Sequence, residues 1–306
     1  IEAFVAGHKQ LCGKLTIAGL SEPLVISEAD LRADATTYLL GMQEAGRIYR
    51  RILEQKGGAG FIVEVSVDEA ETPQGPRELL SILAMLAAEK VPVQTIAPKF
   101  TGRFNKGVDY VGNLAQFERE FDADLCVLRY AVATFGLPDS LKLSVHSGSD
   151  KFSLYPIINR QIHRHQAGLH VKTAGTTWLE EVIGLAEADG EGLAMAKDIY
   201  RGAFEKYDDL TAPYRTVIDI DRASLPAPSE VARWESVRFA AALRHDQKNP
   251  LYHLGFRQLI HVGFKVAAYM GERYTGALDT YRSSVARNVA GNLLDRHLLP
   301  IFTFPK

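Results

Sequence analysis

The stretch LKLSVHSGSDK, at residues 141–151, decides the fold that we expect for this chain. The alternating apolar residues of its first half predict a short strand, and a loop of small, polar and charged residues follows at once. His146, Asp150 and Lys151 therefore stand together behind the carboxyl end of a strand. Parallel α/β proteins present their chemistry at such strand ends. The stretch favours a parallel α/β fold with a functional site at this edge.

Polar residues recur at two other predicted strands. The run of branched apolar residues at 61–67 contains Glu64 and leads into an acidic loop, which we expect to be solvated. The run at 168–172 contains His170 and Lys172 and leads into Thr-Ala-Gly. Three strand ends that carry polar groups favour a functional edge of a sheet over a purely structural one.

Helical segments separate the predicted strands. We expect strands at 61–67, 91–97, 141–145 and 168–172, and helices at about 31–53, 77–89, 113–135 and 176–186. Ser27 and Asp30 form a capping box before the first of these helices, and Gly57-Gly58 ends it. This alternation is typical of βαβ units and a parallel sheet. Two architectures stay open: a smaller open sheet, or the C-terminal part of a (β/α) TIM-barrel-like fold whose first units lie upstream of Ile1.

The strand pattern fades beyond Gly190. Helices are expected at 195–207, 228–243 and 271–297, a strand or a helix start at 258–262, and a surface loop around His163 and His165. We therefore expect two regions, a catalytic βα-repeat region forming a partial barrel at residues 1–190 and a mostly helical region closing the barrel at 191–306. The chain begins without methionine, which favours a trimmed chain or the downstream part of a longer one.

The composition is that of an ordinary globular protein. The chain has 306 residues, of which 46% are hydrophobic and 24% charged, and its net charge of -2 gives no reason to expect a nucleic-acid partner. Two cysteines without metal-binding spacing favour a reducing compartment. No apolar run reaches the roughly 18 residues of a membrane helix. A cytoplasmic location follows, and a homo-oligomer is left open.

Glu64 lies within an apolar strand, where a carboxylate is costly to bury. Desolvation would raise its pKa toward a value useful for proton transfer, which makes it a candidate general acid/base. The alternative is a structural ion pair, for which Lys99 at the end of the next strand is the nearest candidate.

His146 and His170 belong to neighbouring predicted strands, so their rings could meet over one pocket. Two imidazoles beside the Glu64 carboxylate would suit a divalent metal such as Zn, Mn, Ni or Fe. The alternative is that each histidine is a hydrogen-bonded core residue.

Basic residues at the strand ends suit an anionic substrate. We predict as substrate-binding residues Lys99, Asp109, Asp150, Lys151, Lys172 and His261. Asp109 could instead orient its loop, and Lys172 could form a Schiff base if its pKa were depressed. The remaining histidines, His8, His245, His253 and His297, are assigned no role.

Five strings in this order resemble the tagaturonate epimerase family. They are EVSVDE at 64–69, KGVDY at 106–110, HSGSDKFS at 146–153, HVKTAGT at 170–176 and RQLIHV at 257–262. The resemblance covers roughly residues 31–263. It implies a metal-dependent, barrel-type enzyme of hexuronate catabolism that interconverts the ketouronates D-tagaturonate and D-fructuronate.

Within this resemblance, Glu64 matches the catalytic acid/base, and His146 and His170 match site histidines. Members of the family begin with a long N-terminal region carrying early barrel strands, a further catalytic acid and a metal-binding histidine, none of which this chain has. We expect inversion by a retro-aldol step. Two alternatives remain: a Schiff-base aldolase using Lys172, and a non-catalytic fragment that binds sugar acids.

Overall fold

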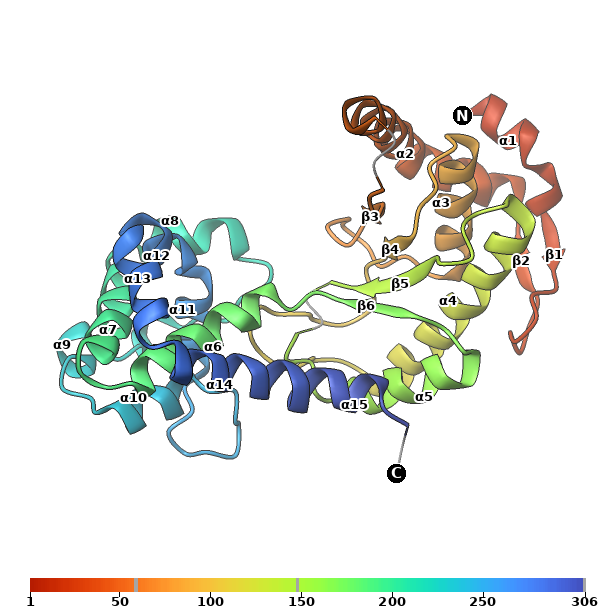
Figure 1. Ribbon diagram of the computed structural model, residues 1–306. Helices are drawn as coiled ribbons and strands as arrows, with labels where there is room; N and C mark the ends of the chain where they lie inside the picture. The colour runs from red at the N-terminus through yellow and green to blue at the C-terminus, as the bar shows by residue number, and fades with distance from the viewer. Residues whose placement is uncertain (58–59, 147–148, 305–306) are drawn as a thin grey trace. The chain divides into compact units, whose positions relative to one another are not determined.

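The computed structural model describes residues 1–57, 60–146 and 149–304, in two compact units (Figure 1). Unit 1 comprises Ile1–Gly102, Gly112–His146 and Arg160–Val171, and unit 2 comprises Arg103–Val111, Ser147–Asn159 and Lys172–Lys306. The chain thus passes between the units several times. This division by compactness differs from the expected regions 1–190 and 191–306, which stay a prediction.

Unit 1 contains a parallel sheet of four strands, as the alternation of strands and helices predicts. The strands follow one another in chain order: β3 (Glu64–Ser66), β4 (Thr95–Ala97), β5 (Lys142–Val145) and β6 (Leu169–Val171). Each is shorter than its predicted range. The mixed α/β class and the parallel sheet are confirmed. The barrel is not, because no closed barrel is present among the residues that the structure describes.

A small antiparallel hairpin precedes the sheet and was not expected from the sequence. It pairs β1 (Gly13–Leu15) with β2 (Leu24–Ile26), after the short helix α1 (Glu2–Gly7) and the 3₁₀ turn η1 (Lys9–Leu11). Strand β1 reads Gly-Lys-Leu and has no β-branched apolar residue, so the sequence gives no strand signal there.

Three long helices precede β3, β4 and β5 in turn along the chain: α2 (Glu28–Lys56), α3 (Pro76–Ala88) and α4 (Leu114–Phe135). The predicted capping box begins α2, since Ser27 Oγ accepts from the Asp30 amide while the Asp30 carboxylate accepts from the Ser27 amide. The helix ends at Gly57, which has a φ of +57°; Gly58, the other half of the predicted stop, lies outside the described residues. Helix α3 packs against both α2 and α4, and its residues 79–86 are all buried. A helix that is apolar on every side is typical of such a central position.

Helix α5 (Tyr155–His165) corrects the predicted surface loop around His163 and His165. Both histidines lie in its last turn. His165 Nε2 lies 2.6 Å from Oδ1 of Asp122 on α4, within unit 1. The sequence signal was present, because the buried residues Ile158 and Ile162 are four apart, as on one face of a helix.

In unit 2, the described residues after Lys172 contain only helices as regular elements. These are α6 (Ala174–Glu187), α7 (Gly190–Glu205), α8 (Tyr207–Thr211), α9 (Pro228–Val231), α10 (Ser236–Leu243), α11 (Leu254–Val262), α12 (Phe264–Met270), α13 (Glu272–Thr280), α14 (Arg282–Ala290) and α15 (Leu299–Phe302), with the 3₁₀ turns η2 (Ala212–Tyr214) and η3 (Arg222–Ser224). The ambiguous segment 258–262 is the end of helix α11. The helix predicted at 271–297 divides at Tyr281 and continues beyond α14 as a π-helix, η4 (Gly291–Leu298).

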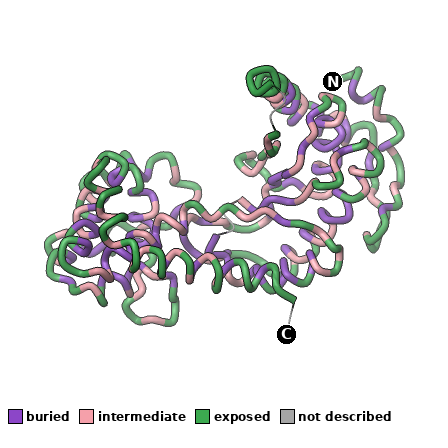
Figure 2. Tube along the Cα trace, viewed as in Figure 1, coloured by how far each residue is buried: buried purple, intermediate pink, exposed green. Residues whose placement is uncertain are grey.

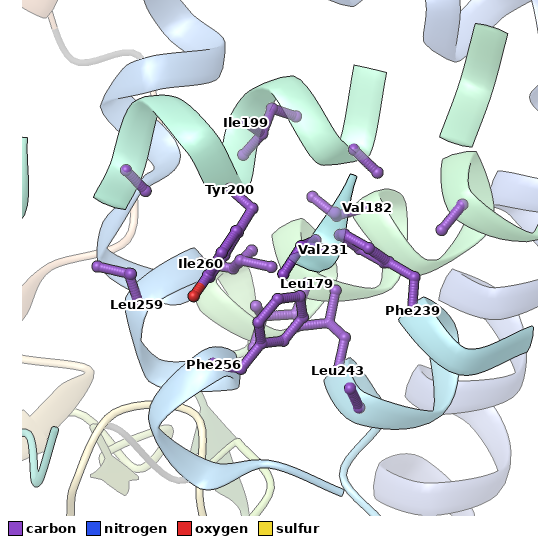
Figure 3. Close-up of a cluster of buried hydrophobic side chains, with 14 of the residues drawn as sticks. Leu179, Val182, Ile199, Tyr200, Val231, Phe239, Leu243, Phe256, Leu259 and Ile260 are labelled. Atoms are coloured by element: carbon purple, nitrogen blue, oxygen red, sulfur yellow. The ribbon is translucent and has the colours of Figure 1, made fainter. Parts of the chain in front are cut away.

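Helices α6, α7, α10 and α11 enclose the hydrophobic core of unit 2 (Figure 3). Tyr200 lies near its centre, with its ring centroid 4.4 Å from that of Phe256. The Tyr200 hydroxyl donates to the carbonyl of Pro226 over 2.8 Å, so its polar end is satisfied although the ring is buried. Burial of each large apolar side chain of this kind contributes about 1.5–3 kcal/mol.

Buried residues lie on the inner faces of the helices of each unit, and exposed residues line their outer faces (Figure 2). Within the described residues, no helix combines the length and the apolar character that a membrane crossing requires.

Candidate active site

Glu64, the first residue of β3, contacts both predicted site histidines. Its Oε1 lies 2.9 Å from Nε2 of His146, and its Oε2 lies 2.8 Å from Nδ1 of His170. An ionised carboxylate can only accept hydrogen bonds, so with Glu64 ionised each of these nitrogens carries the shared proton. The structure thus brings together the three residues that the sequence proposes as acid/base and metal ligands, all within unit 1.

The sheet positions these residues on three strands. Glu64 begins β3, His146 directly follows β5, and His170 lies in β6, paired in register with Ser144. In a flat sheet the first and fourth strands are about 14 Å apart, which is three strand spacings. The 2.8 Å contact between Glu64 and His170 therefore indicates that the sheet curves toward the face that carries them.

Polar neighbours hold both imidazoles. On His146, Nδ1 lies 3.2 Å from Oδ2 of Asp68 and 3.3 Å from Oγ of Ser66, so the ring stands between two carboxylates. On His170, Nδ1 also lies 2.9 Å from Oγ of Ser144. Sequence reasoning missed Asp68 by assigning it to a solvated loop. The sequence signal for Asp68 was its position immediately after the predicted strand at 61–67, which contains Glu64.

The cluster is partly exposed. The side chain of His146 is 8% exposed, that of Glu64 is 25% exposed and that of His170 is 43% exposed. A small molecule can therefore reach the carboxylate and the outer imidazole, while the inner imidazole is held in place.

The donor types of this cluster fit a divalent metal of intermediate softness, since imidazole nitrogen and carboxylate oxygen are its usual ligands. The positions of these donor atoms are less favourable for binding a metal ion. In the described part of the chain, no three His, Cys, Asp or Glu side chains are arranged so that they could hold one metal ion. The nitrogens that would bind a metal face Glu64 instead. A cation would have to replace the shared protons and separate these groups.

Lys99, the predicted partner of a substrate or of Glu64, anchors a loop. Its ammonium group donates to the carbonyl oxygens of Ala70, at 2.5 Å, and Glu71, at 3.2 Å. Its backbone amide donates to the side chain of Gln74. These contacts favour a structural role, and substrate binding by Lys99 stays a prediction.

In unit 2, three of the predicted substrate-binding residues line one cavity of about 160 Å³: Lys151, Lys172 and His261. Lys106 and Ser149 complete its polar wall. Burial lowers the pKa of Lys151 to about 8. Burial, together with the positive charges of Lys106 and Arg257, lowers the pKa of His261 to about 3. Lys106, Lys151 and Lys172 thus line this lysine-rich cavity, with a neutral imidazole in its wall.

Asp150, which directly precedes Lys151, is fully buried. It forms an ion pair with the equally buried Arg257, and Nδ1 of His245 lies 3.4 Å from its Oδ2. Burial alone would raise the pKa of Asp150, but the charge of Arg257 and the contact with His245 hold it far below its ordinary value. The φ of Asp150 is +60°, and its amide donates to Nε2 of His297 over 3.0 Å. Sequence reasoning assigned no role to these two histidines or to Arg257.

Asp109 orders the loop in which it lies. Its carboxylate accepts from the amide and the hydroxyl of Ser153 and from the amide of Tyr110. This agrees with the alternative that Asp109 orients a loop. For Asp109 and Asp150 the contacts favour a structural role, and substrate contact stays a prediction. Ser147 and Gly148, within the deciding stretch, lie outside the described residues.

Comparison with known proteins points to one family. The UxaE family, described as tagaturonate epimerase, matches the chain over residues 8–298. A tagaturonate/fructuronate epimerase of Thermotoga maritima is 32% identical over 246 residues, which are 80% of this chain and 45% of that protein. The chain thus spans about half the length of the curated relative that it matches.

Solved structures share the fold. The native fructuronate-tagaturonate epimerase UxaE from Cohnella laeviribosi superposes with a TM-score of 0.75 at 24% identity, over 98% of this chain and 57% of that one. A glycerol complex of the same enzyme gives a TM-score of 0.74 at 24% identity, over 96% of this chain and 57% of that one. Since the family match extends over nearly the whole sequence, this chain belongs to the UxaE family of tagaturonate epimerases.

Proposed function

We propose that this chain acts as an isomerase that interconverts D-tagaturonate and D-fructuronate, with Glu64 as its acid/base. The observation that carries the proposal is the contact of one partly exposed carboxylate, at the start of β3, with two imidazoles, from β6 and from the residue after β5 of the same parallel sheet. Membership of the family, and the names of the relatives, supply the substrate.

The reaction inverts a carbon that is separated from the ketone by one further carbon. The C–H bond of this carbon is not acidified by enolisation, so removal and return of its proton is unfavourable. A retro-aldol step avoids this difficulty. A base takes the proton of the hydroxyl on the inverted carbon, this carbon becomes an aldehyde, and the electrons of the breaking carbon–carbon bond pass to the ketone fragment as an enediolate.

Glu64 is suited to accept that hydroxyl proton, since its carboxylate is partly exposed while both its oxygens are oriented by imidazoles. His146 keeps the carboxylate in place, because its own ring is held on the other side by Asp68. Once the aldehyde group has turned, the bond re-forms on its other face and Glu64 returns the proton to the new alkoxide. The reaction balances without an oxidant or a reductant.

We further propose a divalent metal, Zn, Mn, Ni or Fe, as cofactor, with His146 and His170 as ligands beside Glu64. The support is the chemistry of the donor set. When bound, such a cation supplies Lewis-acid stabilisation of the negative charge that develops on substrate oxygens. Binding would displace the protons that these groups now share, so it should release protons and weaken as the pH falls. Calorimetric titration of the chain with Zn²⁺ or Mn²⁺ in two buffers of different ionisation enthalpy measures that release.

The direct test of the activity is incubation of the metal-supplemented chain with D-tagaturonate, followed by chromatography of the sugar acids. Formation of D-fructuronate that stops on addition of a chelator supports the metal-dependent epimerase. Conversion that survives chelation favours a Schiff-base enzyme using Lys172. Binding without conversion favours a sugar-acid-binding protein.

The retro-aldol route has its own test. In deuterium oxide, the inverted carbon of the product should carry no deuterium, because its hydrogen never leaves. Trapped three-carbon fragments would add support. Deuterium at the inverted carbon would instead indicate direct proton exchange.

A cytoplasmic location and self-association are part of the proposal, and cell fractionation and light scattering test them.

A further inference from the structure

The loop Asn105–Val108 in unit 2 has four successive carbonyl groups that all accept hydrogen bonds from side chains. Lys151 Nζ donates to the carbonyls of Asn105, at 2.9 Å, and Val108, at 2.7 Å. Gln258 Nε2 donates to that of Lys106 over 3.2 Å, and Arg257 Nε donates to that of Gly107 over 2.5 Å. A short loop with all its carbonyls bound in this way has little conformational freedom.

The three donors are themselves fixed. Arg257 and Gln258 have no exposed surface, and Lys151 is 1% exposed. Lys151 Nζ also donates to the carbonyl of Ser149 over 3.2 Å, so all three of its N–H groups have acceptors. Lys151 therefore braces the loop, and its ammonium group has no donor left for a ligand.

Lys106 lies in the middle of this braced loop. Its amide donates to the carbonyl of Val217 over 2.9 Å, which fixes the backbone from the other side. Its side chain lines the lysine-rich cavity together with Lys172 and Ser149, and its Nζ lies 4.8 Å from the centre of the Tyr214 ring. In the part of the chain that the structure describes, no carboxylate lies within ion-pair distance of Lys106.

The His261 ring packs against Gly107 and Gly175 in the wall of the cavity. A Cβ on Gly107, which has a φ of +71°, would lie 3.0 Å from Cδ2 of His261, and one on Gly175 would lie 2.4 Å from its Nε2. The ring is thus confined, and it is neutral because its pKa is about 3. It can offer a hydrogen bond without adding charge.

We propose that Lys106 is the anion-binding residue of this cavity, held in position by Lys151, Arg257 and Gln258, and that the cavity selects an acidic sugar over its neutral counterpart by binding the carboxylate. The identity of the sugar rests on the proposed function. The binding of an anion does not rest on that function. It rests on the braced loop and on Lys106, which has no carboxylate within ion-pair distance among the described residues. Arg257 and Gln258 are positioning residues, because they act through the backbone of the loop.

The test measures binding of two probes that differ only in the carboxylate, D-galacturonate and D-galactose, by NMR titration of the whole chain. The wild-type chain should bind D-galacturonate more tightly than D-galactose. K106M should lower the affinity for D-galacturonate roughly tenfold or more, as expected for the loss of a charge-assisted contact, and leave that for D-galactose unchanged. K106R should retain most of the difference. Raising the NaCl concentration should weaken the binding of the acid only.

A matched control is K248M, which removes an exposed lysine of unit 2 outside the cavity. The proposal is overturned if K106M binds D-galacturonate as tightly as K248M does, or if the wild-type chain does not distinguish the two probes. Because no turnover is measured, a chain without epimerase activity can still pass this test. An active chain whose affinity for the acid is insensitive to K106M would fail it.

Discussion

Oε2 of Glu64 lies 2.8 Å from Nδ1 of His170, although the two residues are 106 positions apart in the sequence and on the outer strands of a four-stranded sheet. Only a curved sheet allows this contact, because flat packing would separate the two strands by about 14 Å. The curvature brings residues of β3 and β6 and the residue after β5 into one cluster. It thus converts a repeated sequence feature, a polar residue within or directly after an apolar strand, into a candidate acid/base centre.

The first prediction concerns the confinement of His261. G175A should displace this imidazole, because the new Cβ would lie 2.4 Å from its Nε2. We expect a lower melting temperature and weaker binding of sugar acids. Thermal unfolding and NMR titration check both effects. G276A is the matched control, since nothing lies within 4 Å of its Cβ and it is in helix α13. There alanine should stabilise the chain by about 0.5–1 kcal/mol.

The second prediction concerns the buried ion pair of unit 2. R257M removes the partner of Asp150 and the donors to the carbonyls of Gly107 and Leu243. Loss of one member of a fully buried pair leaves the other charge unpaired, so we expect a destabilisation of about 3–5 kcal/mol in urea unfolding. R222M breaks an exposed pair with Asp208 and should change stability by about 1 kcal/mol or less. Similar losses for the two variants would disagree with a structural role for Arg257.

The third prediction concerns Glu180 on α6. Burial raises its pKa to about 7. Asn292 donates to Oε1, whereas Oε2 has no hydrogen-bond partner among the described residues. The folded chain then holds a proton on Glu180 that the unfolded chain loses above the ordinary glutamate pKa of 4.5. The contribution of this group to stability is therefore complete below pH 4.5 and is lost as the pH rises to about 7.

E180Q removes this titration, so its stability relative to the wild type should increase between about pH 5 and pH 8. Urea unfolding at several pH values measures the difference. E191Q, at an exposed position in the first turn of α7, should follow the wild type. A difference between E180Q and the wild type that stays constant with pH would contradict the raised pKa.

The sequence predicted the parallel sheet and the main helices of unit 1 because their signals are local. The capping box of Ser27 and Asp30 and the branched residues before Glu64 are both visible in a short window. The hairpin of β1 and β2 gave no such signal because β1 reads Gly-Lys-Leu, without β-branched apolar residues. The π-helix after Ala290 was also missed, because its hydrogen-bond pattern depends on packing against other parts of the chain, which a short stretch of sequence does not show.

The residues of the candidate site also differ in whether a local sequence signal predicts them. Glu64, His146 and His170 could be proposed because each is a polar residue within or directly after a predicted apolar strand, and neighbouring strands of a sheet can bring such residues together. The environment of Asp150 could not be foreseen, since its partners Arg257 and His297 lie 107 and 147 residues away. A charged residue within an apolar helix, as Arg257 is, was the one local sign of a buried pair.

The most direct measurement of the central claim is the rate of conversion of D-tagaturonate into D-fructuronate by the wild-type chain, E64Q and E69Q, followed by ¹³C NMR with Mn²⁺ present. Glu69 is an exposed acid in the loop after β3 and serves as the control. We predict conversion by the wild type and by E69Q, and a rate at least roughly 100-fold lower for E64Q, the effect expected when an acid/base is removed. Equal rates for E64Q and E69Q, or no conversion by the wild-type chain, would contradict the account.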